Sequence, residues 1–236
     1  MSKQAAIIGL GTFGTCLALT LRDAGYEVLA IDQEAEPVEN ISSQITHAVR
    51  ANATSELALQ KLGIKNVDVA VVAVGSSIQN SVMITILLKR MGVRYIVARA
   101  DNELHGAILD SIGADKIIFP ERDIAVRTGP ILTMRDVADF IPLDKGSGIV
   151  KAKATPYFIG KTLADLGLGP ETKSGATVLM IQRGKEGILN PSSDEVISHI
   201  DVLIIAGNTS DIDKLLEKAD KAEEESRENG NKNSDH

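Results

Sequence analysis

The chain has few aromatic residues and almost no cysteine. Phe, Tyr and Trp make up 3% of its 236 residues, Trp is absent, and Cys16 is the single cysteine. So few rings leave little surface on which the bases of single-stranded nucleic acid can stack. A single cysteine excludes an intramolecular disulfide, and we expect Cys16 to be a small core residue in a reducing compartment.

A positive net charge and long apolar runs are also missing. The formal net charge is −7 at pH 7, which argues against nucleic acid or anionic lipid as a direct partner. No apolar run approaches the roughly 20 residues that span a bilayer, and the first residues lack a signal-peptide pattern. We therefore expect a cytoplasmic protein with no direct membrane insertion.

The feature that organises the chain is a glycine-rich stretch at residues 7–14, IIGLGTFG. It follows an apolar segment and precedes an expected helix at residues 12–24. In this pattern Gly9 permits a tight turn, Gly11 lets the backbone approach a pyrophosphate, and Gly14 lets helix and strand pack closely. The helix N-terminus would attract the anion, so the pattern predicts a phosphate-binding loop.

A carboxylate stands where a nucleotide-binding half places its ribose acceptor. The expected strand at residues 27–31 ends in Asp32, about 20 residues beyond the glycine loop. We expect Asp32 to accept hydrogen bonds from ribose hydroxyls. The alternative role of Asp32 is that of a helix N-cap or turn residue.

Alternation of strand and helix continues to about residue 119. Further strands are expected at residues 46–50, 67–74, 95–98 and 116–119, and helices at 55–62, 78–91 and 103–112. Short connections between such units are typical of a doubly wound parallel sheet. The sequence therefore predicts a Rossmann-like α/β domain.

Beyond this point the pattern changes. Residues 120–141 predict a long amphipathic helix with a break or kink at Gly129-Pro130, and 143–147 resemble a linker. Strands are then expected at 149–154, 177–183, 187–189 and 202–206, with a short helix at 163–166. We expect domains at residues 1–141 and 142–216, the second a small α+β module, and a charged disordered tail at 217–236.

Catalytic groups are hard to find in the sequence. No catalytic triad or metal-ligand spacing is present, and the four histidines, which include His199, are scattered. A binding module therefore fits better than an enzyme. An NAD-dependent oxidoreductase and a stand-alone nucleotide sensor are the competing hypotheses, because the same loop and Asp32 would serve them equally well.

Several segments taken in order resemble one known family. The segments are residues 7–14, Asp32, 51–54 (ANAT), 71–75 (VVAVG), 112–115 (IGAD), 120–121 (PE), 181–185 (IQRGK), 190–191 (NP) and 201–207 (DVLIIAG). Together they are similar to RCK (KTN) domains, the gating subunits of bacterial Trk and Ktr potassium uptake systems. The resemblance covers residues 4–212 and implies a Rossmann-like nucleotide-binding domain followed by a TrkA-C module.

The resemblance also implies a regulator without chemistry of its own. In this family the long helix pairs two subunits, and the pairs assemble into rings, commonly octamers, beneath an integral-membrane potassium translocator. We would then expect a protein at the inner face of the membrane, held there by its transporter. Nucleotide exchange would change the ring and so gate the pore. The apolar stripe of the helix has packing on its own sheet as an alternative explanation.

Carried over by position, the resemblance implies a set of ligand-binding residues. The glycine loop with Thr12 and Phe13 would hold phosphates, Asp32 the ribose, Asn52, Ala53 and Ile78 the adenine, and Arg99 the phosphates again. Glu121 matches a residue that helps to hold a divalent or sodium cation. The alternatives are a loop role for Asn52, a surface ion pair for Arg99, and a favourable first-turn charge for Glu121.

One departure from the family concerns Thr12. Many Ktr members carry Arg there, and its charged hydrogen bond to a terminal phosphate contributes roughly 1.5 to 3 kcal/mol. Thr12 offers a hydroxyl without charge. The preference for ATP over ADP is therefore open, and AMP and NAD(H) stay among the candidate ligands.

The C-terminal module suggests a second ligand. In some Ktr relatives this module binds cyclic di-AMP between two copies, and the matching residues here are Ile159, Arg183, Ile188, Asn190, Pro191 and His199. Arg183 would face a phosphate, and Pro191 with the isoleucines would flank a base. The alternative is that the isoleucines belong to strand cores and that Asn190-Pro191 is a turn.

Overall fold

The chain forms two compact units in the computed structural model, Met1–Arg122 and Asp123–His236. The structure describes residues 3–75, 77–171 and 175–232, with side chains only as far as residue 222 in the last segment. We describe each unit by itself. No helix in the described part of the chain is both long enough and apolar enough to cross a membrane.

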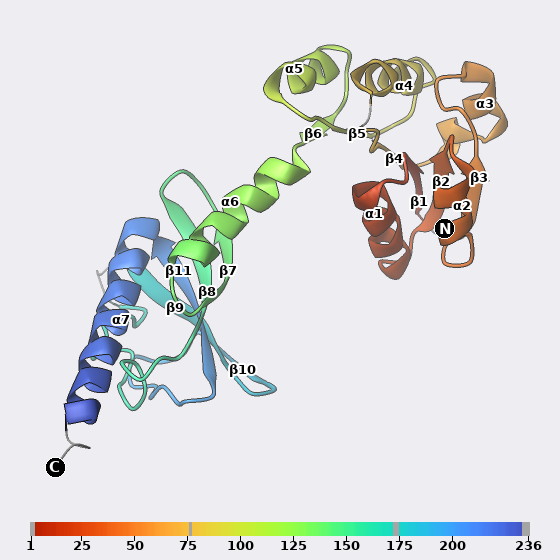
Figure 1. Ribbon diagram of the computed structural model, residues 1–236. Coiled ribbons are helices and arrows are strands. Elements are labelled where there is room, and N and C mark those ends of the chain that lie inside the picture. The colour runs from red at the N-terminus through yellow and green to blue at the C-terminus, as the bar shows by residue number, and fades with distance from the viewer. Residues whose placement is uncertain (1–2, 76, 172–174, 233–236) are drawn as a thin grey trace. The chain divides into compact units, whose positions relative to one another are not determined.

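The first unit is a parallel sheet with helices on both faces (Figure 1). Its strands are β1 (Gln4–Ile8), β2 (Glu27–Asp32), β3 (His47–Arg50), β4 (Val69–Val72), β5 (Ile96–Arg99) and β6 (Lys116–Ile118), in the order β3-β2-β1-β4-β5-β6. Its helices are α1 (Thr12–Asp23), α2 (Ala35–Ser42), α3 (Glu56–Lys61), α4 (Ile78–Arg90) and α5 (Glu103–Ser111), with the 3-10 turn η1 (Ile64–Asn66). This confirms the doubly wound sheet that the alternation predicts.

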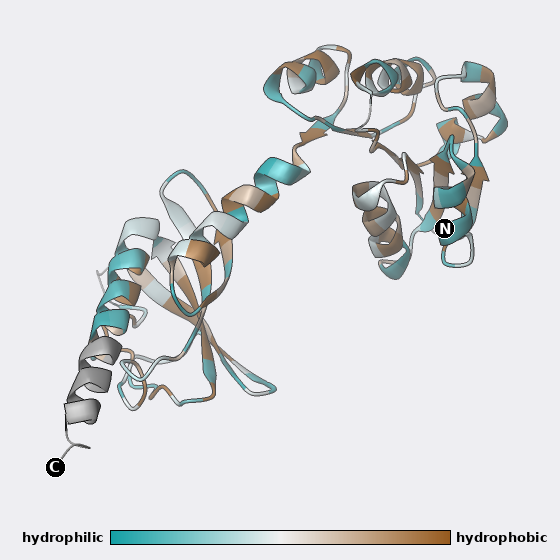
Figure 2. Cartoon of the chain, viewed as in Figure 1, coloured by the Kyte–Doolittle hydropathy of each residue, from teal (hydrophilic) through white to brown (hydrophobic). Residues whose placement is uncertain are grey.

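Two apolar cores enclose this sheet because neighbouring residues on a strand face opposite sides. Ile7 packs with α1 and α2, whereas the next residue, Ile8, packs with α3, α4 and α5. Both side chains are at most 2% exposed. Figure 2 shows the same arrangement as hydrophobic colour along the strands and polar colour on the outer helix faces. A sheet covered on both faces explains the valine-rich run of β4, which lacks alternation.

The second unit is built on an antiparallel sheet. Its strands are β7 (Val137–Pro142), β8 (Ser147–Lys153), β9 (Ala176–Arg183), β10 (Glu186–Leu189) and β11 (Asp201–Asn208). Along the chain, helix α6 (Pro120–Thr133) precedes these strands and α7 (Thr209–Lys232) follows them. The strand order is β10-β9-β11-β8-β7. Ile212, Leu216 and Ala219 form a buried stripe of α7 that packs on the sheet with Phe158 and Leu163.

The prediction of one helix over residues 120–141 is wrong at its C-terminal end. The helix ends at Thr133, Asp136 adopts a positive φ of 59°, and β7 then pairs with β8. The two compact units divide after Arg122, whereas the sequence predicts a domain boundary after residue 141. The helix is continuous through Pro130, so of the break or kink expected at Gly129-Pro130 the break is absent.

Other local expectations are corrected as well. The linker predicted at 143–147 is the turn of the β7–β8 hairpin, closed by a hydrogen bond from the Leu143 N–H to the Ser147 carbonyl. Residues 163–166 form turns, not a helix, and Cys16 is exposed. Residues 217–232, predicted as a disordered tail, continue α7, because Ala219 extends the buried stripe. The last four residues of that predicted tail lie outside the described residues.

Candidate functional site

One cavity of the first unit lies where the order of the strands reverses. Strand β1 has β2 on one side and β4 on the other, so the chain leaves the carboxyl ends of β1 and β4 in opposite directions. Such a switch point opens a crevice in a parallel sheet. The cavity there has a volume of about 230 Å³ and is lined by Ile8, Gly9, Gly11, Ile31, Asp32, Gln33, Ala51, Asn52, Ala53, Thr54, Ala73, Val74, Gly75, Asn80, Ile84 and Arg99.

Each glycine of the loop meets a different requirement. Gly9 has a φ of +100°, and a Cβ there would come within 3.0 Å of the backbone of Ala73 and Val74 at the end of β4. A Cβ on Gly14 would collide with the carbonyl oxygen of Gly9, which fixes the close packing of α1 on the loop. Gly11 has an ordinary φ, and nothing in the described chain lies within 4 Å of its Cβ position.

The N-terminus of α1 is open toward this cavity. Gly11 is the N-cap residue of α1 and offers no side chain to the first N–H groups of the helix. Unpaired N–H groups and the helix dipole attract an anion at such an end. Helix α4 also begins here, capped by the Ser77 hydroxyl, which accepts from the Asn80 N–H at 3.2 Å.

Asp32 joins the glycine loop to the end of β2. Its carboxylate accepts hydrogen bonds from the Leu10 N–H at 2.6 Å and the Glu34 N–H at 2.9 Å. Each oxygen has a further lone pair, so the carboxylate retains acceptor capacity on the side that lines the cavity. The alternative of a turn residue is supported by the hydrogen bond from the Glu34 N–H, whereas the N-cap residue of α2 is Glu34 and not Asp32.

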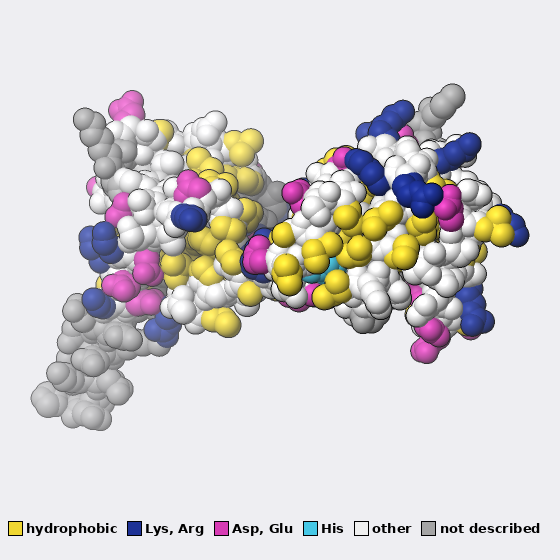
Figure 3. Space-filling model, turned by 90° about the horizontal axis from the view of Figure 1, so that it is seen from above, with side chains coloured by type: hydrophobic (Ala, Val, Ile, Leu, Met, Phe, Trp, Pro, Cys, Tyr) yellow, Lys and Arg dark blue, Asp and Glu magenta, His cyan; other side chains and the backbone are white. Residues whose placement is uncertain are grey.

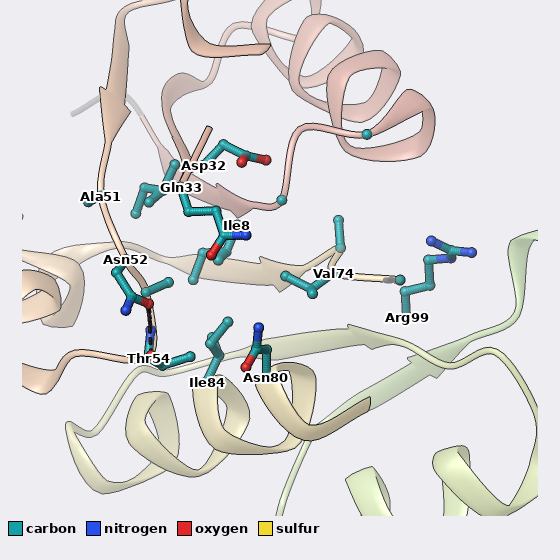
Figure 4. Close-up of a pocket in the computed structure, with 16 residues that line it drawn as sticks. Ile8, Asp32, Gln33, Ala51, Asn52, Thr54, Val74, Asn80, Ile84 and Arg99 are labelled. Carbon is teal, nitrogen blue, oxygen red and sulfur yellow. Dashed lines mark hydrogen bonds between the residues drawn. The ribbon is translucent and has the colours of Figure 1, made fainter. Parts of the chain in front are cut away.

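The two ends of the cavity differ in chemistry, as Figure 4 shows. Asn52 and Thr54 lie at one end, where the Asn52 side-chain oxygen accepts from the Thr54 N–H at 2.9 Å and hydroxyl at 2.7 Å. This bonding leaves the Asn52 NH₂ group as its donor toward a ligand. At the other end stands Arg99, the only side chain with a positive charge among the cavity-lining residues.

The structure brings together six of the residues that the sequence singles out as nucleotide-binding: Gly9, Gly11, Asp32, Asn52, Ala53 and Arg99. Gly14 supports them from α1, whereas Thr12, Phe13 and Ile78 do not line the cavity. Ile78 instead lines a separate groove and is 44% exposed. Successive helix residues turn by about 100°, so Asn80, and not Ile78, faces the cavity from α4.

Four of the ten lining residues that the sequence does not name as nucleotide-binding are Gln33, Val74, Gly75 and Asn80. Their positions in the sequence could have predicted that they line the cavity, because each follows the carboxyl end of a strand or lies in the first turn of the next helix. Parallel strands end at one edge of the sheet, so such positions converge.

Glu121 pairs with Arg99. The Arg99 Nη2 atom lies 2.7 Å from Glu121 Oε1 and 3.3 Å from Asp101 Oδ1. Arg99 therefore forms the ion pair that the alternative explanation expects and also lines the cavity. No cluster of three or more His, Cys, Asp or Glu side chains that could hold a metal ion occurs in the described chain.

Comparison with known proteins follows the division into two units. Residues 5–120 match the model of the TrkA-N domain, and residues 149–220 match the TrkA-C domain. The chain is 38% identical over 215 residues to the Ktr system potassium uptake protein C of Bacillus subtilis, covering 91% of this chain and 96% of that protein. The chain belongs to this Ktr family.

Other members of the Ktr family match equally fully. Potassium uptake protein A is 39% identical over 214 residues in Bacillus subtilis and 33% over 216 residues in Vibrio alginolyticus, each match covering 96% of the relative. Among solved structures, the RCK domain of GsuK has a TM-score of 0.62 at 17% identity, over 92% of this chain and 48% of that chain. A GsuK channel bound to NAD has a TM-score of 0.60 at 18% identity, over 93% and 39%. These structures confirm the fold.

Within the TrkA-C part, Arg183 is held by acidic side chains. Its Nε and Nη2 atoms donate to the two oxygens of Asp201 at 2.8 Å each, and Nη1 lies 3.1 Å from Glu195. This pairing raises the pKa of Arg183, mainly through the hydrogen bonds to Asp201. Burial opposes ionisation of Asp201, but hydrogen bonds from Arg183 and the Ser198 N–H outweigh it and lower the pKa of that carboxyl. Arg183 therefore has its charge matched within the chain.

The other residues singled out for a second ligand divide between surface and core. Ile159, Asn190 and His199 are exposed, Pro191 is buried, and Ile188 packs against the apolar core. Asn190 has a positive φ of 48°, and its N–H bonds the Leu179 carbonyl at 2.9 Å. Asn190-Pro191 thus forms a bend after β10 in a left-handed conformation that asparagine tolerates, which agrees with the alternative of a turn.

Proposed function

We propose that this protein is a nucleotide-binding regulatory subunit of a potassium uptake system, which gates an integral-membrane translocating subunit and carries out no chemistry of its own. The Ktr relatives named as potassium uptake proteins match along 96% of their length, so the proposal extends to both units. The protein would work in the cytoplasm, at the inner face of the membrane, through its contact with the translocator.

The observation that carries nucleotide binding is the open space around Gly11. Gly9 and Gly14 are required by contacts within the protein, but the described chain gives no reason for glycine at position 11. A phosphate that approaches the uncapped α1 N-terminus would supply that reason, because a side chain there would meet the ligand. With the phosphates at this position, Asp32 would accept hydrogen bonds from the hydroxyls of the adjoining ribose.

The size and charge of the cavity favour an adenine nucleotide. A volume of about 230 Å³ is below that of typical small-molecule pockets, roughly 300 to 1,000 Å³, so we expect it to hold a nucleoside with its phosphates extending outward. Arg99 at the far end supports a ligand with more than one phosphate. ADP and ATP are the ligands we favour, and NAD(H) is the dinucleotide to compare, as one GsuK channel of this fold is bound to NAD.

Assembly into a ring is supported by two separate apolar surfaces. Helix α6 has no buried residue, and Ile124, Val126 and Leu132 on it are 61%, 50% and 80% exposed. The second surface is an open groove of about 780 Å³ between α4 and α5, where Figure 3 shows hydrophobic side chains gathered and where Ile78 and Met83 are exposed. A ring made of dimers needs two kinds of contact, and we propose a homodimer through α6 within an octamer.

Two further ligands belong to the proposal. Glu121 would help to hold a divalent or sodium cation. No acidic cluster that could hold a metal occurs among the described residues, so we propose that the phosphates supply further oxygen ligands. The TrkA-C module would bind cyclic di-AMP between two copies, with contacts limited to the exposed candidates, since Arg183 is already paired. Titration with cyclic di-AMP tests this site, and an absence of saturable binding at micromolar ligand would remove it.

Titration calorimetry of the purified protein tests nucleotide binding. We expect saturable binding of ADP or ATP with one site per chain, and light scattering should give the mass of an oligomer. Turnover of a nicotinamide cofactor with any small substrate would contradict the proposal and favour an oxidoreductase.

A further inference from the structure

Arg99 contacts the candidate nucleotide site and the start of α6 at the same time. Its guanidinium lines the cavity and lies so close to Gly75, in the loop after β4, that a Cβ on Gly75 would collide with it. Its Nη2 atom donates to Glu121 Oε1 at 2.7 Å. Glu121 is the second residue of α6, whose residues from Asp123 onward belong to the second unit.

The guanidinium is not fully satisfied by these partners. The Nε atom of Arg99 is buried and has no hydrogen-bond partner among the described residues. Buried donors in native proteins are nearly always paired, and each exception asks for an explanation. An acceptor from a bound ligand would supply the missing partner once the Arg99 side chain turns to expose Nε.

The ion pair between Arg99 and Glu121 can be replaced at small cost in free energy. The Arg99 side chain is 20% exposed, whereas the Glu121 side chain is 67% exposed. An ion pair with one partner so exposed contributes little, because water solvates the free carboxylate well. A phosphate carries more charge than a carboxylate and offers several acceptor oxygens, so it can replace Glu121 on the same guanidinium.

We infer that Glu121 occupies the place on Arg99 that a nucleotide phosphate takes, so that binding of a nucleotide di- or triphosphate releases Glu121 and with it the first turn of α6. This inference rests on the proposed function and adds the link between the phosphates and the element that joins the two units. It also explains how Glu121 becomes available to a cation, because the carboxylate is unpaired only after the exchange.

The inference predicts a gain of affinity when Glu121 loses its charge. In titrations with ADP and a metal chelator, Glu121→Gln should bind ADP about two- to five-fold more tightly than the native chain, because the phosphate no longer has to displace a carboxylate from Arg99. Glu103→Gln is the matched control. Glu103 is an exposed carboxylate that pairs with Arg122 and does not line the cavity.

A second pair of variants tests whether the gain passes through Arg99. Arg99→Gln should weaken ADP binding, and the double variant Arg99→Gln/Glu121→Gln should bind ADP no more tightly than Arg99→Gln alone. Equal ADP affinity in the native chain, Glu121→Gln and Glu103→Gln would overturn the inference and leave nucleotide binding intact. Absence of ADP binding by the native chain would overturn the proposed function, and the inference with it.

Discussion

At the scale of single residues, Asp32 gives the most direct test of how a ribose would be held. Asp32→Asn keeps the shape of the side chain but loses the charge, and we expect it to lower affinity for ADP about tenfold or more, because hydrogen bonds to a charged group contribute about 1.5 to 3 kcal/mol. Titration calorimetry measures the change, with exposed Asp23→Asn as the control. Unchanged affinity would remove Asp32 from the site.

Thr12 allows a test of phosphate discrimination. It is the first residue of α1, exposed and outside the cavity lining, so a longer cationic side chain has room to reach a terminal phosphate. Thr12→Arg should raise affinity for ATP more than for ADP. Equal gains for the two nucleotides would show a general electrostatic effect and not recognition of the third phosphate.

Arg183 is predicted to matter for stability. Asp201 lies opposite it in the register of β9 and β11, and its side chain has no exposed surface. Arg183→Ala leaves that carboxylate buried and unpaired, which should cost about 3 to 5 kcal/mol in unfolding free energy at pH 7. Thermal unfolding measures this, and Arg127→Ala, which breaks the exposed pair with Asp139, should have a much smaller effect.

The acid dependence of the same pair has a definite sign. The pKa of Asp201 is lowered in the folded protein, so its contribution to stability is present above the unfolded value of about 3.9 and is lost as pH falls through the folded value. The native chain should therefore lose stability below about pH 4. Arg183→Ala should lose less there, since protonation relieves its unpaired carboxyl, and parallel acid curves for the two would contradict this explanation.

Six of the cavity-lining residues could be predicted from the sequence, but the contacts between the side chains of the site could not. The glycine loop and Asp32 follow a spacing that is typical of a strand, turn and helix, so a local pattern was sufficient to find them. The ion pair of Arg183 and Asp201 depends on strand register over 18 residues, which no local pattern specifies. Arg99 and Glu121 likewise meet only through the parallel pairing of β5 and β6.

At the scale of elements, the first unit follows its sequence closely because strands covered on both faces and short connections leave few alternatives. The structure of residues 134–141 in the second unit could not be predicted in this way, because Met134, Ala138 and Ile141 also fit a helical spacing. The pairing of Phe140 with Val150 decides in favour of β7. Tertiary contact therefore overrides a local pattern that two structures can satisfy.

Helix α7 gives a testable consequence of the corrected C-terminus. Leu216 is 3% exposed and packs on the sheet of the second unit, so Leu216→Ala should cost about 2 to 5 kcal/mol in unfolding free energy. Lys218→Ala, on the exposed side of the same helix, is the control and should change little. Equal thermal unfolding of the two variants would contradict the packing of α7 on the sheet.

At the scale of the whole molecule, membrane association is expected to depend on the partner. The net charge of −7 disfavours direct binding to anionic lipid, so washed vesicles that contain a Ktr translocator should retain the protein and vesicles without it should not. Firm retention by the empty vesicles would contradict the proposed assembly.

The proposed function requires that a nucleotide bound at the cavity controls potassium flux. The direct measurement is potassium uptake into vesicles holding a Ktr translocator, with the native chain or Asp32→Asn, in ATP, in ADP and without nucleotide. We predict that uptake with the native chain differs between ATP and ADP and that Asp32→Asn removes the difference. Uptake that is the same in every nucleotide condition, or the same with and without the protein, would contradict the account.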